Sequence, residues 1–204
     1  MNPARPTAHD KILDAALQVI RTQGLAGTSV DELCVAAGVT KGAFFHHFKT
    51  KDALAIAAAD HFSRIADGVF TNAPYRALPD PVARLIGYVD FRQAMMKGEM
   101  PAFTCLVGTM AQEAYLTHPE VRAACAQSID AHVDMLEADI ADAMRARNVE
   151  PPGGPRGLAL YMQAVIQGAF VLAKAHGDAA VAANCLDHLR NHLAGLFGWK
   201  ERNA

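Results

Sequence analysis

A short segment of this 204-residue chain, residues 28–51, concentrates side chains that can contact nucleic acid. Its cations can bind phosphates, whereas hydroxyl and imidazole groups can read the edges of bases in a groove. An aromatic ring can lie against a sugar or a thymine methyl group. The candidate DNA-binding residues are Thr28, Ser29, Thr40, Lys41, Gly42, Phe45, His46, His47, Lys49 and Lys51.

Different members of this set suit different contacts with DNA. Phosphate contacts are predicted for Thr28, Ser29, Lys41, Lys49 and Lys51. Contacts within a groove are predicted for Thr40, Lys41, Phe45 and His46. Because Gly42 has no Cβ, the N-terminus of its helix can approach a phosphate closely, where free N–H groups and the helix dipole favour an anion. His47 is expected to be partly structural.

The spacing of cap residues in this segment predicts two short helices joined by a tight turn. Ser29 and Glu32 have the spacing of a capping box. Gly38 suits the left-handed position that ends a helix, and Thr40 can cap the next helix. We therefore predict a helix-turn-helix motif over about residues 29–48, which would place its second helix in the major groove of DNA.

The motif resembles that of the TetR-type (tetracycline-repressor-like) regulators over about residues 10–54. The resemblance is carried by the capping box, by Ala37-Gly38-Val39 and by the run from Thr40 to Phe48, Thr-Lys-Gly-Ala-Phe-Phe-His-His-Phe. The second aromatic residue of that pattern is usually Tyr, whose hydroxyl can reach a phosphate. It is Phe45 here, so the ring contact remains and the hydroxyl contact is missing.

The charge balance is consistent with DNA contact at one end of the chain. The whole chain has a formal charge of −2, which by itself does not indicate a nucleic-acid-binding protein. Residues 1–51 hold six Lys and Arg against four Asp and Glu, a balance of +2, and the remaining 13 against 17 leave −4. A mildly basic N-terminal part on an acidic body supports the motif.

Helical spacing of apolar residues along the whole chain predicts an all-α fold with two domains. A three-helix DNA-binding domain is predicted over 7–53 and a helical bundle for ligand binding and dimerisation over 54–200. About nine helices are expected, near residues 8–23, 29–37, 41–48, 51–70, 81–96, 102–112, 117–147, 156–175 and 179–197.

The last two predicted helices are too apolar for the surface of a monomer, and a two-fold contact between two chains would bury them. The resemblance implies the same contact, because TetR-type regulators dimerise through their last two helices. The predicted dimer interface comprises Val165, Ile166, Ala169, Phe170, Leu186, Leu189, Leu193 and Phe197.

The resemblance also implies a small organic effector bound in the C-terminal helices, with release from DNA. Mostly apolar walls with a few polar groups suit such a molecule. The predicted pocket residues are Phe62, Phe91, Met95, Phe103, Cys105, Leu106, Thr109, Met110, His132, Tyr161 and Gln167. The expected partners are a near-palindromic double-stranded operator, this effector and a second copy of the chain.

Other classes of function find little support in the sequence. There is no nucleophile elbow, Gly-rich phosphate loop or H-E-x-x-H motif, so no catalytic residues and no cofactor are expected. His188 and His192 lack a clear third ligand, and no metal site is predicted. No apolar run reaches about 18 residues and no signal segment is visible, so we expect a cytoplasmic protein with no membrane span.

Two alternatives stay open at this stage. One is a helical protein that binds or sequesters a ligand and does not act on DNA. The other is a regulator that senses thiol oxidation or a metal, because the chain has four cysteines and nine histidines.

Overall fold

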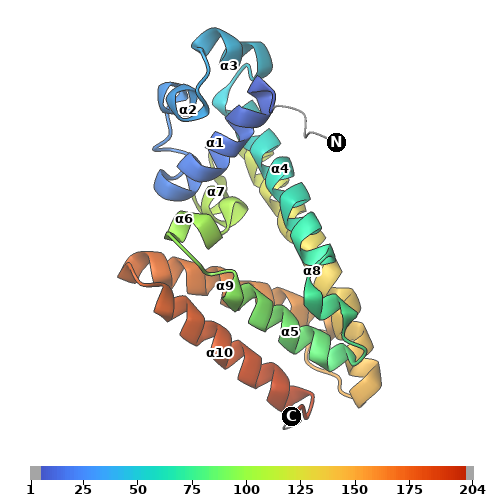
Figure 1. The fold of residues 1–204 in the computed structure, drawn as a ribbon. Coiled ribbons are helices and arrows are strands. Elements are labelled where there is room, and N and C mark those ends of the chain that lie inside the picture. Colours follow the sequence, from blue (N-terminus) through green and yellow to red (C-terminus); the bar gives the residue numbers. More distant parts are fainter. Residues whose placement is uncertain (1–5, 201–204) are drawn as a thin grey trace, which may run out of the picture. The chain divides into compact units, whose positions relative to one another are not determined.

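The computed structural model describes residues 6–200, and these residues form ten α-helices and one 3-10 helix, with no strand (Figure 1). In chain order they are α1 (Ala8–Gln23), α2 (Val30–Ala37), α3 (Lys41–His47), α4 (Lys51–Thr71), η1 (Pro74–Ala77), α5 (Pro81–Ala94), α6 (Met100–Phe103), α7 (Leu106–Ala114), α8 (Pro119–Arg147), α9 (Gly154–His176) and α10 (Ala179–Leu196). The expected all-α class is confirmed.

The chain forms two compact units. The first unit comprises Met1–Ala66 and Thr104–Ile129, and the second comprises Asp67–Phe103 and Asp130–Ala204. Helices α4 and α8 contribute residues to both units. The predicted division into functional domains at residues 53 and 54 stays a prediction.

The helices of the motif begin and end where the cap residues predict. The Ser29 hydroxyl accepts a hydrogen bond from the backbone N–H of Glu32, and the Glu32 carboxylate accepts one from the N–H of Ser29 at 2.8 Å. Gly38 ends α2 in the left-handed conformation, with φ of 63°. The Thr40 hydroxyl then accepts from the N–H of Ala43 and starts α3.

The core of the first unit holds these three helices together. It includes Ile12 on α1, Leu33 on α2, Phe44 on α3 and Leu54 on α4, none of which is exposed. Leu106 of α7 belongs to the same core, and α7 packs on α1. The DNA-binding motif is therefore fixed to a helix from later in the chain as well as to its own neighbours.

The second unit is built around the pair of helices α9 and α10, which lie side by side, with α5 packed against α10 (Figure 1). Met162 and Ile166 of α9 are fully buried, as are Leu186 and Leu193 of α10. Helix η1 packs on α5, where Gly87 permits the close approach: a Cβ there would lie 2.7 Å from the Cβ of Tyr75.

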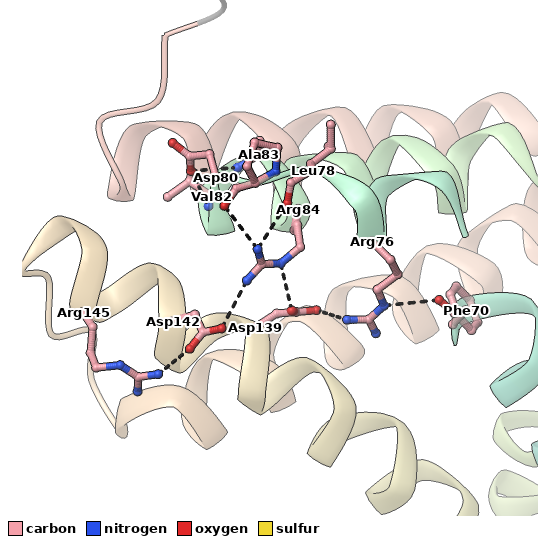
Figure 2. Close-up of polar contacts among 11 residues, drawn as sticks. Phe70, Arg76, Leu78, Asp80, Val82, Ala83, Arg84, Asp139, Asp142 and Arg145 are labelled. Atoms are coloured by element: carbon pink, nitrogen blue, oxygen red, sulfur yellow. Dashed lines mark hydrogen bonds and ion pairs between the residues drawn. The ribbon is translucent and has the colours of Figure 1, made fainter. Parts of the chain in front are cut away.

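A network of ion pairs joins η1 and α5 to α8 in this unit (Figure 2). The Asp139 side chain is 12% exposed, and its carboxylate accepts from Arg76 and from Arg84, the latter at 3.3 Å. Arg84 also donates to Asp142 at 3.1 Å, and Asp142 pairs with Arg145. A carboxylate this deeply buried needs such partners to stay charged.

The structure differs from the sequence prediction between residues 100 and 119. The helix predicted over 102–112 is interrupted at Thr104 and Cys105, where α6 ends and α7 starts. The Cys105 thiol accepts from the N–H of Gly108 at 3.4 Å and caps α7. Apolar composition does not reveal this break, so ten α-helices replace the nine expected.

Helix α9 is long and apolar enough, by length and composition alone, to cross a membrane. In the structure, 44% of the most apolar 18-residue stretch of this helix is buried within the protein. The prediction of no membrane span rested on the absence of a long unbroken run of apolar residues. In α9 such a run is interrupted by Gln163, Gln167 and Gly168. The core helices of soluble proteins meet the same criterion, so this is weak evidence for a span.

Candidate functional sites

Helix α3 presents one polar and aromatic face to solvent. Thr40, Lys41 and Gly42 are exposed at its start, and Phe45 and His46 are exposed in its last turn. The Phe45 side chain is 45% exposed although it is a large aromatic group. All predicted groove residues therefore lie on the surface of the first unit.

The opposite face of α3 is anchored by aromatic packing. Phe44 and Phe48 are buried, with their ring centroids 6.0 Å apart. The imidazole of His9 on α1 stacks on Phe48 at 5.1 Å and meets His47 edge-on at 5.6 Å. These contacts agree with a partly structural role for His47. His9 was not predicted, because nothing in its local sequence distinguishes it from a surface histidine.

Lys41 is paired with a carboxylate in the absence of DNA. Its ammonium lies 2.6 Å from the Asp31 carboxylate of α2, and both side chains are more than half exposed. The hydrogen bond and the charge of Asp31 raise the pKa of Lys41. A phosphate has to displace Asp31 to use this lysine fully.

The other predicted phosphate ligands are engaged to different degrees. Thr28 is 2% exposed and donates its hydroxyl hydrogen to the Gly24 carbonyl at 2.6 Å. The Ser29 hydroxyl belongs to the capping box. Lys51 donates to the carbonyls of Leu25 and Thr28, at 3.0 and 3.2 Å. Its ammonium thus supports the loop before α2 and has at most one further N–H for a phosphate.

Lys49 is exposed, and its ammonium donates to the Phe45 carbonyl at 2.9 Å. That bond spans one turn at the end of α3 and uses one of the three ammonium N–H groups. Lys49 therefore keeps donors for a phosphate while lying beside the exposed face of α3.

Glu113 of α7 and His118, which directly precedes α8, make polar contacts with the loop before α2 and with α4 within the first unit. The Glu113 carboxylate of α7 accepts from the N–H of Ala26 at 2.9 Å. It occupies the space where a side chain at Gly24 would begin, since a Cβ there would lie 2.0 Å from a Glu113 oxygen. His118 bonds Asp52 of α4 at 2.9 Å. Sequence reasoning missed these contacts, which span 66 to 87 residues of chain.

The predicted dimer residues are largely used inside one protomer. Seven of the eight are buried, and Val165 is half-buried. The apolar side chains left exposed on α9 are Leu160, Tyr161, Val171 and Leu172, each 43 to 47% exposed. They lie on one face of α9 together with Ala164 and Gly168. A dimer contact through α9 would therefore use this exposed set in addition.

The predicted pocket residues divide between the two units. Five belong to the first unit: Phe62, Cys105, Leu106, Thr109 and Met110. Six belong to the second: Phe91, Met95, Phe103, His132, Tyr161 and Gln167. Leu106 and Met110 are fully buried in the core of the first unit, whereas Tyr161 is exposed beside His192 at 5.3 Å.

His132 is the centre of a polar chain inside the second unit. Its Nε2 lies 2.9 Å from the Tyr88 hydroxyl, which also accepts from the Gln163 amide at 3.4 Å. Burial, with smaller contributions from Arg92 and Arg76, lowers the pKa of His132 to about 3. The imidazole is therefore neutral at physiological pH and can accept the tyrosine hydrogen through Nε2.

The cysteines and the possible metal ligands bear on the alternative that the protein senses thiol oxidation or a metal. All four thiols are free, and burial raises the pKa of Cys34 and that of Cys125, the latter to about 11. Buried protonated thiols react slowly, which leaves the half-buried Cys105 and Cys185 as the more accessible pair. Within residues 6–200, no three His, Cys, Asp or Glu side chains are grouped so that they could hold a metal ion.

Comparison with protein families gives two matches. The family described as bacterial regulatory proteins, tetR family, matches residues 12–58. The family described as tetracyclin repressor-like, C-terminal domain, matches residues 81–189, more than half of the chain. The first match covers the motif with its aromatic anchor, and the second begins at α5 and ends within α10.

Individual relatives are more distant. The transcriptional regulator AcuR of Cereibacter sphaeroides is 29% identical over 126 residues, which span 60% of this chain and 56% of AcuR. The transcriptional repressor DhaR of a Mycobacterium species is 24% identical over 171 residues, 84% of each chain. The solved regulatory protein TetR from Rhodobacter sphaeroides shares the fold, with a TM-score of 0.81 at 23% identity over 91% of this chain and 98% of that one.

Proposed function

Because the chain belongs to the TetR family of bacterial regulatory proteins, we propose that it acts as a homodimeric repressor released from its operator by a small organic effector. DNA binding and regulation of transcription follow from the family, which is not enzymatic. The dimer contact, the operator symmetry and the effector are proposed from the residues described above. We expect the protein to act in the cytoplasm, where bacterial DNA lies.

The exposed face of α3 is the observation that carries this proposal. A recognition helix needs a rigid base and a free face, and Phe44 and Phe48 supply the base. Thr40, Lys41 and His46 then offer a hydroxyl, a cation and an imidazole to DNA.

A second copy of the chain would supply the affinity that one short helix lacks. Two DNA-binding domains related by a two-fold axis read half-sites about 34 Å apart, which is one turn of DNA. The exposed apolar face of α9, with Gly168 and Ala164 between its larger side chains, suits close packing against the same face of a partner. The operator is therefore expected to be a near-palindrome.

Release by an effector requires that the effector bind one conformation better than the other. The polar chain of His132, Tyr88 and Gln163 lies among aromatic side chains of the second unit. Apolar walls with a few fixed polar groups are typical of sites for small organic molecules. We therefore propose the second unit as the place where the effector binds.

The test is selection of bound fragments from genomic DNA, followed by a salt series on the best fragment. We expect a near-palindromic consensus with steeply salt-dependent affinity. The His46→Ala variant should lose about tenfold in affinity at one base position, as expected for loss of a base-edge contact. Gln127→Ala, an exposed substitution on α8, serves as the matched control. Equal binding to selected and random DNA would contradict sequence-specific repression.

A further inference from the structure

Arg92 of α5 differs from every other arginine that the structure describes in the second unit. Those six arginines each pair with at least one carboxylate: Arg76 with Asp139, Arg84 with Asp139 and Asp142, Arg145 with Asp142, Arg147 with Asp80, Arg156 with Asp130, and Arg190 with Asp90. Figure 2 shows three of these arginines, Arg76, Arg84 and Arg145, with their carboxylates. Within residues 6–200, Arg92 has no such partner, and its Nε–H is buried without a hydrogen-bond acceptor.

The surroundings of Arg92 are aromatic. Its guanidinium carbon lies over the Phe70 ring at 5.3 Å and over the Phe170 ring at 5.4 Å. Phe91 lies 6.0 Å from Phe70, and Phe103 lies 6.1 Å from Phe170. These five residues, called the Arg92 cluster below, come from α4, α5, α6 and α9 of the same unit.

Contact with aromatic rings alone does not account for this arrangement. Cation–π contacts stabilise a guanidinium, but they leave its N–H donors unsatisfied. A buried donor without an acceptor destabilises the folded state, and native proteins keep few such groups. Asp90, two residues before Arg92 on α5, pairs with Arg190, and Asp139 pairs with Arg76 and Arg84. An acceptor from outside the chain would complete the site.

The chemistry of the Arg92 cluster defines that acceptor. A guanidinium binds a planar carboxylate through two parallel N–H bonds, which include Nε–H in the side-on arrangement. The Phe70 and Phe170 rings against the cation, with Phe91 and Phe103 packed on them, favour an apolar body attached to the carboxylate. The neutral His132 and Tyr88, which contact Phe70 at 4.7 and 5.7 Å, add polar groups without adding negative charge.

We propose that Arg92 binds the carboxylate of an organic acid effector, with the phenyl rings of the Arg92 cluster against its apolar part. This proposal rests on the proposed function, because it gives the chemical class of the effector in the second unit. An effector of this kind would neutralise the cation that the apoprotein leaves unpaired, and would therefore stabilise the second unit specifically in the bound state.

Binding should also change the environment of His132. Arg92 is one of the two cations that lower the pKa of His132. A carboxylate on Arg92 offsets that positive charge, so the pKa of His132 should rise from about 3 when the acid binds. The imidazole thus reports occupancy of the site independently of DNA.

The experiment measures thermal stability and calorimetric binding of the full chain without DNA. The probes are benzoate and hexanoate, with the neutral benzamide and hexanamide as matched compounds, each at about 10 mM because weak affinities are expected for such small ligands. At least one carboxylate should raise the melting temperature, and its amide should bind at least about tenfold more weakly. Inorganic phosphate at the same concentration tests for a general anion site.

Substitutions of Arg92 test whether this arginine binds the carboxylate. Arg92→Met should reduce carboxylate affinity by about tenfold or more, while Arg145→Met, an exposed arginine of the same unit, should leave it unchanged. Because Met removes an unpaired buried donor, the Arg92→Met apoprotein should melt no lower than the wild type. Arg92→Gln provides a second variant if Met perturbs folding. Titration of the His132 ring by NMR should show the rise in its pKa with the carboxylate.

Three outcomes would overturn the proposal: no stabilisation by either carboxylate, equal effects of acids and amides, or equal binding of phosphate and carboxylate through Arg92. Operator binding is measured separately on wild type and Arg92→Met. If both still bind the operator while carboxylates fail, only the effector class is wrong. If neither binds DNA, the proposed function fails.

Discussion

At the scale of single residues, Lys41, which we propose as a DNA-binding cation, is already paired with an anion in the free protein. Its ammonium pairs with Asp31 at 2.6 Å, so binding a phosphate means exchanging one anion for another. Asp31 also places a negative charge beside the expected path of the DNA backbone. We therefore expect the carboxylate to lower the affinity for DNA of any sequence.

Asp31→Asn should raise affinity for operator and random DNA alike by about three- to tenfold at low salt, with the difference shrinking as salt rises. The measurement is a fluorescence-anisotropy titration on both DNAs at several salt concentrations. Asp60→Asn, which removes an exposed carboxylate paired with Arg64 on α4, controls for net charge. Equal gains in the two variants would show that only overall charge matters.

His132 gives the second unit a defined response to acid. Its folded pKa is about 3, below the usual value of 6.5, so the charged form is disfavoured in the folded state. The unfolded chain takes up a proton as pH falls through 6.5, and the folded chain does not. The resulting stability is therefore fully present above about pH 6.5 and is lost progressively towards pH 3.

Between pH 7 and pH 5 this titration should lower the free energy of unfolding by about 2 kcal/mol. Chemical denaturation at several pH values measures the loss. The charges that act on the imidazole are those of Arg92 on α5 and Arg76 on η1, and its direct neighbours are the Tyr88 hydroxyl and the Phe70 ring. In His132→Asn the slope over this pH range should flatten, whatever the absolute stability. An unchanged slope would assign it to other groups.

At the scale of elements, the ion-pair network fixes η1 and α5 to the end of α8. Asp139→Asn leaves Arg76 and Arg84 without their main carboxylate in a site where the Asp139 side chain is only 12% exposed. Breaking a buried pair on one side typically costs about 3 kcal/mol. Urea unfolding of the variant measures this.

Asp142→Asn is the matched control, because its side chain is 46% exposed and Arg84 keeps Asp139. Its cost should stay below about 1 kcal/mol. Similar losses in the two variants would mean that burial does not set the strength of this network (Figure 2).

The helix boundaries were predictable because their signals are local. Ser29 with Glu32, Gly38 and Thr40 each act within three residues of a helix end, and the structure shows their hydrogen bonds. The break at Thr104 and Cys105 was missed because a thiol cap and a buried threonine look like continued apolar helix in the sequence.

The tertiary contacts could not be read from the sequence. The contact between Glu113 and the N–H of Ala26 spans 87 residues, and nothing in either local pattern indicates the other. Periodicity likewise marks an apolar face but not its partner. Ile166 and Leu189 were assigned to the dimer interface, yet both are already buried within one protomer.

At the scale of the whole molecule, the proposed dimer depends on the face of α9 that the protomer leaves uncovered. Leu160, Tyr161, Val171 and Leu172 are each more than 40% exposed. Burial of large apolar groups on association contributes about 25 cal/mol per Å² of apolar surface, before the cost of lost freedom. A charge placed among them would have to be buried without a partner.

Leu172→Glu should therefore convert the dimer to a monomer at micromolar concentration, as measured by sedimentation equilibrium, while leaving the protomer folded because Leu172 is 46% exposed. Operator affinity should fall by about a hundredfold or more, because a monomer has one DNA-binding domain and contacts only one half-site. Affinity for a single half-site should be unchanged. Ala146→Glu, exposed on α8, controls for the added charge. If Leu172→Glu remains a dimer, another surface joins the two copies, and operator affinity should then be unaffected too.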